Sequence, residues 1–157
     1  MIVVADTTPL NYLVLIDEAQ LLPALFERVF IPQAVLAELQ HPEASAKVRQ
    51  WVATPPIWLE VSHISLPART LPIPLDPGER EAIQLAIERG IETILIDETA
   101  GRKVVESLGM EARGTLGILE RGAQLGLTNF GKALRKLEQT KFRMSPSLKA
   151  VFLSRNS

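Results

Sequence analysis

The chain lacks cysteine entirely and has only two histidines and one tyrosine among its 157 residues. Without cysteine it forms no disulfide, and thiolate nucleophiles and thiolate-ligated metal sites are excluded. No apolar run approaches the roughly 20 residues of a membrane span, because Asp17 and Glu18 end the run that begins at Leu10. The first residues also lack the basic region and cleavage site of a signal peptide. We therefore expect no membrane segment and a reducing, cytoplasmic environment.

The charges of this chain are unevenly distributed, although its hydrophobic content of 46% argues against disorder. Residues 1–98 hold 6 Lys and Arg against 14 Asp and Glu, a net charge of −8, whereas residues 99–157 hold 11 against 4, a net charge of +7. An acidic part that holds cations beside a basic part that holds phosphates is typical of a nuclease. Solvated faces whose charges segregate without function explain the distribution equally well.

Short apolar runs alternate with helical patterns along the chain, which predicts an α/β fold. Their β-branched composition is typical of strands in a parallel sheet that is covered on both faces. We expect strands at 1–5, 28–31, 57–64, 93–96 and 110–112, and helices at 10–16, 20–27, 32–39, 45–52, 77–89, 116–125, 130–140 and 146–153, with one more helix through Val104 and Val105. The length suits one domain over 1–157, with the helices from about 130 packed on it or at a dimer interface.

Capping patterns predict several helix boundaries. Thr8, which precedes a proline, and Thr115 are expected N-caps. Asp76 and Glu79 occupy the N-cap and N3 positions of a capping box, with a proline between them at the first helical position. Gly90 is the expected stop of the helix that follows.

Two of the apolar runs end in an aspartate, Asp6 after the first predicted strand and Asp97 after the fourth. In parallel sheets, ligands bind outside the carboxyl ends of the strands. If these two strands are neighbours, the two carboxylates repel each other by roughly 4 kcal/mol at about 4 Å and an effective dielectric constant of ~20. A bound cation or a shared proton is the usual compensation.

Two further carboxylates, Glu38 and Glu79, complete a set of four. Glu38 lies late in the helix after the second strand, and Glu79 lies in the first turn of the helix that leads to Asp97. Glu79 reaches the carboxyl edge of the sheet only if the loop from Leu66 brings its helix start over that edge. Taken singly, the four residues also have structural explanations: a helix cap for Asp6, a solvated side chain for Glu38, half of a capping box for Glu79 and a turn for Asp97.

A set of carboxylates without histidine or cysteine partners favours a hard cation, Mg²⁺ or Mn²⁺. His41 and His63 have no metal-ligand partner at helical spacing, and we expect both to be surface or packing residues. A cation held by carboxylates suits phosphodiester hydrolysis, because it lowers the pKa of a bound water and stabilises the leaving oxygen. This reaction needs no covalent nucleophile, in keeping with a chain that has no cysteine and no G-x-S-x-G motif.

Five motifs along the chain resemble those of a PIN domain. They are V-V-A-D-T-T-P-L from Val3, I-P-x-x-V-x-x-E-L from Ile31, D-P-G-E-x-E-A-I-x-L-A from Asp76, L-I-D-E from Leu95 and G-T-L-G from Gly114. Each motif is weak alone, but all five in this order and at these spacings are specific and cover most of the chain. The chain is most similar to a prokaryotic subfamily of small PIN-like proteins related to VapC toxins.

The resemblance implies a three-layer α/β/α fold with a central parallel sheet of about five strands, in which the first and fourth strands are neighbours. It also implies a Mg²⁺- or Mn²⁺-dependent endoribonuclease that acts on RNA, forms a homodimer and pairs with an antitoxin protein as the toxin component. Position 79 carries glutamate where many VapC-like proteins carry aspartate, which is a match of charge and not of identity.

The same resemblance assigns the site residues. The acidic positions, which we expect to be catalytic, are Asp6, Glu38, Glu79 and Asp97. The expected metal ligands among them are Asp6, Glu79 and Asp97. Supporting residues are expected at Thr8, which matches the Ser or Thr after the first aspartate, and at Glu98 and Arg102, which resemble features of the subfamily.

Two other functions are consistent with parts of the sequence. A PIN-like scaffold that binds RNA or a protein without cutting keeps the same fold, and the glutamate at position 79 allows this reading. A phosphoryl-transfer enzyme or a receiver domain on a similar sheet needs a second acidic residue close to Asp6, but Thr7 and Thr8 stand there.

Two groups of side chains suit contacts with RNA and also have simpler explanations. Trp51 and Trp58 are able to stack on bases, but core or dimer packing explains them as well. The densest basic stretch either contacts phosphates or forms a solvated helix face, and it consists of Lys132, Arg135, Lys136, Lys141 and Arg143.

Overall fold

The computed structural model describes residues 1–68 and 70–156, and within them five strands form one sheet in the order β3-β2-β1-β4-β5, with every pair parallel. The strands are β1 (Ile2–Ala5), β2 (Arg28–Ile31), β3 (Leu59–Val61), β4 (Thr93–Leu95) and β5 (Glu111–Arg113). The central strand β1 pairs with β4, and Ala5 lies opposite Leu95. The predicted parallel sheet and the predicted adjacency of the first and fourth strands are both confirmed.

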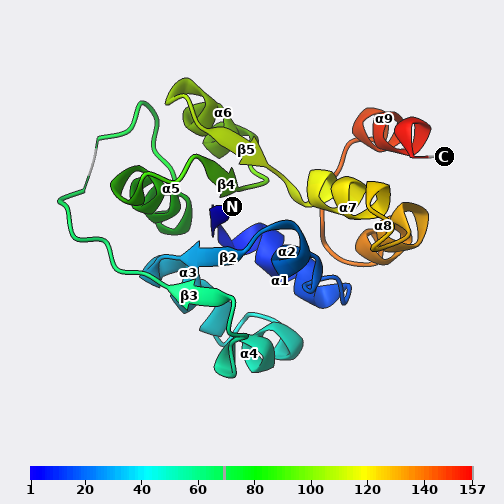
Figure 1. The fold of residues 1–157 in the computed structure, drawn as a ribbon, viewed down its shortest axis with the longest axis horizontal. Helices are drawn as coiled ribbons and strands as arrows, with labels where there is room; N and C mark the ends of the chain where they lie inside the picture. The colour runs from blue at the N-terminus through cyan, green and yellow to red at the C-terminus, as the bar shows by residue number, and fades with distance from the viewer. Residues whose placement is uncertain (69, 157) are drawn as a thin grey trace.

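The helices of the described residues cover both faces of this sheet. They are α1 (Thr7–Leu15), α2 (Leu21–Leu25), α3 (Gln33–Gln40), α4 (Ala46–Ala53), α5 (Pro77–Arg89), α6 (Thr99–Ser107), α7 (Thr115–Gln124), α8 (Phe130–Glu138) and α9 (Pro146–Arg155). Figure 1 shows α5 and α6 on one side of the sheet, α1 to α4 on the other, and α7 to α9 together at one end of the molecule. The predicted three-layer α/β/α architecture is therefore confirmed.

Successive side chains of the central strands β1 and β4 point into two different apolar cores. Val3 and Ala5 of β1 pack with residues of α1, α3, α4, α7 and α8. Val4 of β1 and Ile94 of β4 pack on the other side with α5 and α6. Burial on both faces explains why these strands are continuous apolar runs and not alternating ones.

Two helices begin differently from the prediction, and both differences concern threonines near the sheet edge. Helix α1 begins at Thr7 with Asp6 in the N-cap position, so Thr8 is not the cap. Helix α7 begins at Thr115 after an N-cap at Gly114. The hydroxyls of Thr7 and Thr115, now inside the first turns, donate to carboxylates from distant parts of the chain in charge-assisted hydrogen bonds.

The other expected boundaries hold within a few residues. The predicted strand at 57–64 is limited to Leu59–Val61, an edge strand paired only with β2. The helix expected at 20–27 ends at Leu25, because Phe26 is already extended and leads into β2. In α5, Asp76 caps the helix as predicted by accepting the Glu79 backbone N–H at 2.8 Å.

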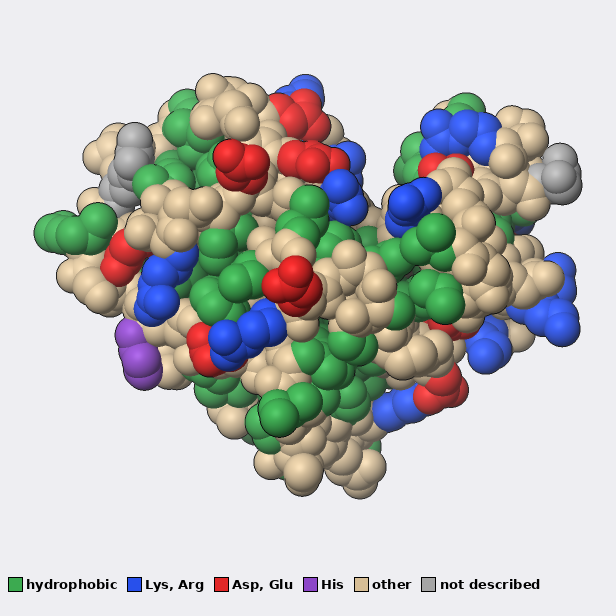
Figure 2. Space-filling model, in the orientation of Figure 1, with side chains coloured by type: hydrophobic (Ala, Val, Ile, Leu, Met, Phe, Trp, Pro, Cys, Tyr) green, Lys and Arg blue, Asp and Glu red, His purple; other side chains and the backbone are tan. Residues whose placement is uncertain are grey.

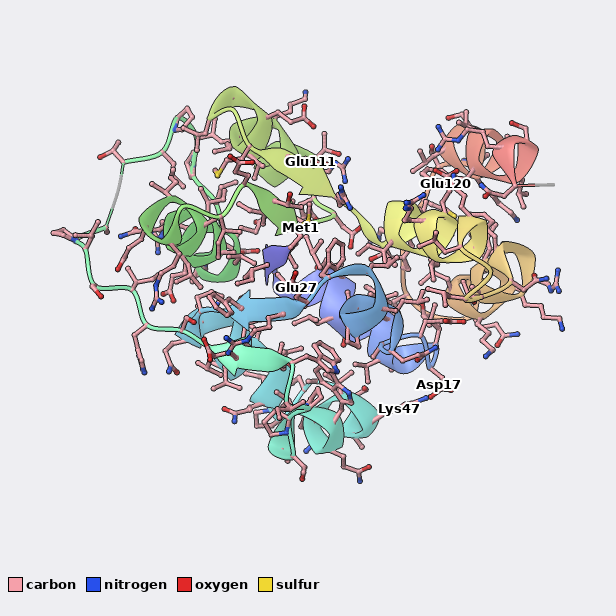
Figure 3. All side chains as sticks on the ribbon, viewed as in Figure 1. Met1, Asp17, Glu27, Lys47, Glu111 and Glu120 are labelled. Carbon is pink, nitrogen blue, oxygen red and sulfur yellow. The ribbon has the colours of Figure 1, made fainter. Side chains whose placement is uncertain are left out.

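The C-terminal helices differ in how firmly they are packed. Helix α8 buries Phe130, Leu134 and Leu137 in the core, whereas α9 has no buried residue. Helix α9 is held by a stacked pair of rings, Phe152 on Phe130 at 6.1 Å. Glu120 of α7 also accepts hydrogen bonds from the end of α9, and Figure 3 shows it on the side of α7 that faces this helix. Helix α9 therefore rests on α7 and α8 through a few side chains.

None of the helices in residues 1–68 and 70–156 combines the length and the apolar composition needed to cross a bilayer.

Candidate active site

Asp6 lies buried at the carboxyl end of the central strand. Its backbone N–H continues the ladder by donating to the Leu95 carbonyl at 2.9 Å, and the residue is 4% exposed. Its side chain makes no capping hydrogen bond with α1, so the purely structural explanation for this residue fails. The pKa of Asp6 is raised from 3.8 to about 7, mainly by burial and also by the charges of Asp76, Glu38 and Asp97, while a hydrogen bond from the Thr7 backbone opposes the shift. The protein therefore holds a carboxyl group here whose ionised form is costly.

Helix α5 begins over the carboxyl edge of the sheet, as Glu79 requires. A Cβ atom on Gly78 would lie 2.6 Å from Oε1 of Glu38 and 3.2 Å from Oδ1 of Asp6. The first turn of α5 therefore touches both carboxylates through the one residue that has no side chain. Any other residue at position 78 would push at least one of these carboxylates away.

A hydrogen bond between α3 and α5 fixes the two helices that carry Glu38 and Glu79. Helix α3 starts after Pro32, whose side chain offers no cap. Glu81 of α5 supplies one instead, because its Oε1 accepts the backbone N–H of Ala34 at 3.1 Å. This negative side chain also lies at the positive end of the α3 dipole. On the same helix, Glu38 is held by Thr7, whose hydroxyl donates to Oε2 at 2.5 Å.

Glu79 contains a buried polar atom without a partner. The residue is 6% exposed, and its Oε2 has no hydrogen-bond partner among the described residues. Gly101 lies against this atom, since a Cβ there would approach it to 2.7 Å. The pKa of Glu79 is raised from 4.5 to about 8, mainly by burial and also by its side-chain hydrogen bond to Asp76 and by the charges of Asp76 and Asp6. A buried, partnerless carboxylate oxygen is costly for folding and is a candidate ligand atom.

Asp76 belongs to the same cluster, although the sequence motifs indicated only a cap. Its Oδ1 caps α5 by accepting the Glu79 N–H. Its charge raises the pKa values of both Asp6 and Glu79. Because Asp76 is exposed, it lies at the solvent side of the cluster. We name Asp6, Glu38, Asp76 and Glu79 the acidic cluster.

Asp97 is held in a different way from the acidic cluster. Thr115 donates to both of its oxygens, from the backbone N–H to Oδ1 at 2.8 Å and from the hydroxyl to Oδ2 at 2.7 Å. Gly114 leaves room for Arg102, since a Cβ there would lie 2.8 Å from both Asp97 Oδ1 and Arg102 Nη1. Burial raises the pKa of Asp97, while the hydrogen bonds from Thr115 and the charge of Arg102 lower it. Asp97 is thus oriented and partly neutralised by the protein itself.

The structure brings the four predicted carboxylates to one edge of the sheet, with Asp97 close enough to Asp6 to raise its pKa. Of the supporting residues, Arg102 contacts the Ile96 carbonyl at 3.2 Å beside Asp97. Thr8 and Glu98 line the adjoining cleft and make no hydrogen bond to the acidic residues in the described part of the chain. His41 and His63 are both exposed, so of the two expected roles, surface or packing, both residues take the first.

The donor chemistry of this site fits a hard divalent cation, since it offers carboxylate oxygens, one of them partnerless and buried. Within residues 1–68 and 70–156, however, no three His, Asp or Glu side chains are already arranged to hold a metal ion. A metal ion held by three of these carboxylates would therefore require their side chains to move. The assignment of Asp6, Glu79 and Asp97 as metal ligands stays a prediction.

Several contacts of the site were not predicted. Thr7 holds Glu38 although Thr8 matched the motif, and the adjacent threonines gave no signal to separate them. Gly78 and Gly114 lie inside the motifs D-P-G-E and G-T-L-G. The motifs do not show that these glycines make room for side chains from other parts of the chain. Asp76 and Thr115 were interpreted only as caps. Each of these roles depends on a partner far away in the sequence.

A deep cleft of about 1060 Å³ opens beside Asp97. One wall comes from α6, β5 and α7, and the opposite wall comes from residues 141–145 and α9. Figure 2 shows the corresponding notch between the main body and the lobe at the C-terminal end. The cleft is large enough for several groups of a polymeric ligand, and it leads to a strand-end carboxylate.

Replacing Thr115 by Val is expected to destabilise the protein by about 1–2 kcal/mol, because Asp97 loses a hydroxyl donor in a site where Thr115 is fully buried. Urea unfolding measures the change. Thr115→Ser, which keeps the hydroxyl, is the control and is expected to recover most of the loss. A Val variant as stable as the wild type would show that this hydrogen bond does not hold Asp97.

Comparison with known proteins agrees with this geometry. A family model described as a PIN domain matches residues 2–157 of the chain. No curated protein matches the chain, and no solved structure matches it. The family match spans all five strands and every residue of the acidic cluster. The chain therefore belongs to the PIN domain family.

Proposed function

We propose that this protein is a Mg²⁺- or Mn²⁺-dependent endoribonuclease. PIN domains are in general nucleases and typically use divalent metals. The substrate, the metal and the reaction of this chain are our inference from the site. At the carboxyl edge of the sheet, the acidic cluster lies beside a cleft that is lined by arginine and lysine side chains. This combination suits a phosphodiester substrate and its metal ion.

The observation that carries the proposal is the buried pair of Asp6 and Glu79, whose pKa values are raised to about 7 and about 8. Burying such groups without a cation partner lowers the stability of the fold. Groups with strongly perturbed pKa values therefore tend to occur at functional sites. Arg102 compensates Asp97, but no Lys or Arg in the described residues forms an ion pair with Asp6 or Glu79. A divalent cation supplies the missing positive charge.

The residues take the following roles in this proposal. Asp6, Glu79 and Asp97 would hold the cation, which would supply positive charge to acidify a water and to stabilise the leaving oxygen. Glu38, oriented by Thr7, accepts a hydrogen bond from the attacking water and positions it. Thr115 and Arg102 favour the ionised form of Asp97 against the effect of burial, and Thr115 orients its carboxylate.

Incubation of the purified protein with labelled single-stranded RNA tests the proposal. We expect cleavage with Mn²⁺ or Mg²⁺ and none with EDTA. Because water and not the ribose 2′-hydroxyl attacks, the products should carry no 2′,3′-cyclic phosphate, which separates this activity from a contaminating metal-independent ribonuclease. Failure to cut RNA with either metal would contradict the proposal.

Replacing Gly78 by Ala is expected to lower the cleavage rate by about 100-fold, because the new Cβ displaces Glu38 by roughly an ångström. Stability should change little, since the helical backbone accepts Ala and the displaced atom is the end of a side chain. Gly131→Ala in α8 is the control, because its Cβ would make only an ordinary contact at 3.6 Å with Asn129. Equal cleavage by the two variants would contradict the role of Gly78.

A binding module that does not cut is the second candidate, and one observation favours it. The described residues contain no ready three-ligand site, so the carboxylates must move before a metal binds. Under this alternative the protein binds RNA in its cleft and shows no metal-dependent cleavage. The RNA assay therefore separates the two functions.

The toxin role rests on the similarity to VapC-like PIN proteins. We infer that the protein acts in the cytoplasm as the toxin of a toxin–antitoxin pair and forms a homodimer. Partly exposed apolar residues at the surface of α9, namely Leu148, Val151 and Leu153, support an interface with another protein. Growth arrest on expression, absent in the Asp6→Asn variant, is the expected result, and light scattering measures the dimer. Normal growth would contradict the toxin role.

A further inference from the structure

We propose that Lys141 and Arg143 form a phosphate clamp on the far wall of the cleft, which holds the backbone of a single-stranded RNA opposite Asp97. This inference rests on the proposed action on RNA. It divides the basic stretch of the sequence into two parts with different roles. Lys132, Arg135 and Lys136 lie on α8 and do not line the cleft, whereas Lys141 and Arg143 line it.

The other basic side chains that line the cleft already have partners within the protein. Arg102 donates to the Ile96 carbonyl, and Arg113 forms an ion pair with Glu111 at 2.8 Å. Arg121 donates to a glutamine side chain at 3.4 Å. Lys141 and Arg143 are exposed, and neither has a hydrogen-bond or ion-pair partner in residues 1–68 and 70–156. Their donors are therefore free to bind phosphate oxygens.

An aromatic pair connects this wall to the catalytic edge. Phe142, between the two cations, packs edge-on against Tyr12 of α1, with ring centroids 5.1 Å apart. Burial raises the pKa of the Tyr12 hydroxyl, the charge of Asp97 also raises it, and the charge of Arg143 lowers it. Tyr12, Asp97 and Arg143 all line the cleft, so a strand held at Arg143 lies in the same cleft as Asp97.

The arrangement favours a single strand over a duplex. Grooves that bind single-stranded nucleic acid commonly have basic side chains along the path of the phosphate backbone and aromatic rings beside them. A duplex turns its bases inward and offers no ring face to Tyr12 or Phe142. The wall is also held in place, because α9 is fixed to α7 by hydrogen bonds to Glu120 and to α8 by the Phe152–Phe130 stack.

Fluorescence anisotropy in EDTA measures binding apart from cleavage. The probes are a labelled single-stranded RNA and a hairpin duplex of the same length. The test variant is Lys141→Gln/Arg143→Gln, and the matched control is Lys132→Gln/Arg135→Gln, which removes the same charges from the neighbouring helix. We expect the test variant to bind the single strand about 10-fold more weakly at low salt, with a salt slope smaller by about 1.4. The control should bind like the wild type, and the duplex should bind more weakly than the single strand.

Each outcome decides the proposal. Equal losses in the two variants would overturn the clamp and indicate unspecific attraction, even for a protein that cuts RNA. Equal binding of duplex and single strand, or no binding of the single strand by the wild type, would also overturn it. A smaller salt slope for the test variant than for the wild type would support the clamp even if the protein does not cleave RNA. Failure of the nuclease proposal can therefore be distinguished from failure of the clamp.

Discussion

The Asp6→Asn variant should lose RNA cleavage by about 100-fold or more while its metal-free form becomes more stable than the wild type. Asparagine has the shape of aspartate but carries no charge, so it removes a metal ligand and a buried negative charge together. Asp6 is 4% exposed and surrounded by other carboxylates. Few substitutions of a polar residue are expected to stabilise a protein, which makes the direction of the change informative.

The stability difference should depend on pH in a defined way. The pKa of Asp6 is raised from 3.8 to about 7 in the folded protein. Well below pH 3.8 the Asp6 carboxyl is protonated in both the folded and the unfolded chain, so its charge does not lower the free energy of unfolding. As pH rises toward 7 only the unfolded chain releases the proton, and the free energy of unfolding falls by up to about 4 kcal/mol. Above this range the loss is constant.

Urea unfolding of the metal-free proteins at about pH 5 and about pH 8 measures this difference. The gain from Asp6→Asn should be larger at the higher pH. Asp17→Asn is the control, because Asp17 is exposed and its pKa is lowered by its ion pair with Lys47 at 2.6 Å. Figure 3 shows this pair at the surface, far from the sheet. The control should cut RNA normally and gain no stability, and an Asp6→Asn variant less stable than wild type would contradict the account.

The Glu79→Gln variant should lose cleavage to a similar degree and gain stability at higher pH. The pKa of Glu79 is raised to about 8, so its charged form is disfavoured up to that pH. Glu79 donates a hydrogen bond to Asp76 only while its carboxyl is protonated. The amide of glutamine provides an N–H donor toward Asp76 at every pH. The neutral side chain also removes the partnerless charge at Oε2.

Glu79→Asp separates the charge from the shape of this residue. Aspartate keeps the negative charge and shortens the side chain by one methylene. It should therefore gain no stability at higher pH, and any cleavage that it keeps reports whether the carboxylate still reaches the metal. Thermal unfolding and RNA cleavage of the two variants, measured side by side, test both points. A Gln variant that still cuts RNA would exclude Glu79 as a metal ligand.

The fold was accessible from the sequence because its signals are local. The apolar runs at Val3 and Ile94 mark buried parallel strands, and Asp76 and Gly90 mark the ends of α5. The edge strand β3 was predicted too long, because one neighbouring strand supports only Leu59–Val61. The alternation of strands and helices then leaves few possible topologies.

The site was only partly accessible, because its contacts join distant segments. The four carboxylates were found from their positions in motifs and at strand ends. The roles of Thr7, Gly78 and Thr115 depend on partners at least 18 residues away, which no local pattern reveals. The division of the basic stretch between α8 and the cleft also required the structure, since Lys136 and Lys141 look alike in the sequence.

Calorimetric titration of Mn²⁺ into the metal-free protein tests the central claim most directly. We expect saturable binding by the wild type and by Asp17→Asn, and binding by Asp6→Asn that is weaker by at least about 100-fold. Equal Mn²⁺ binding by Asp6→Asn and the wild type, or no binding by the wild type, would contradict it.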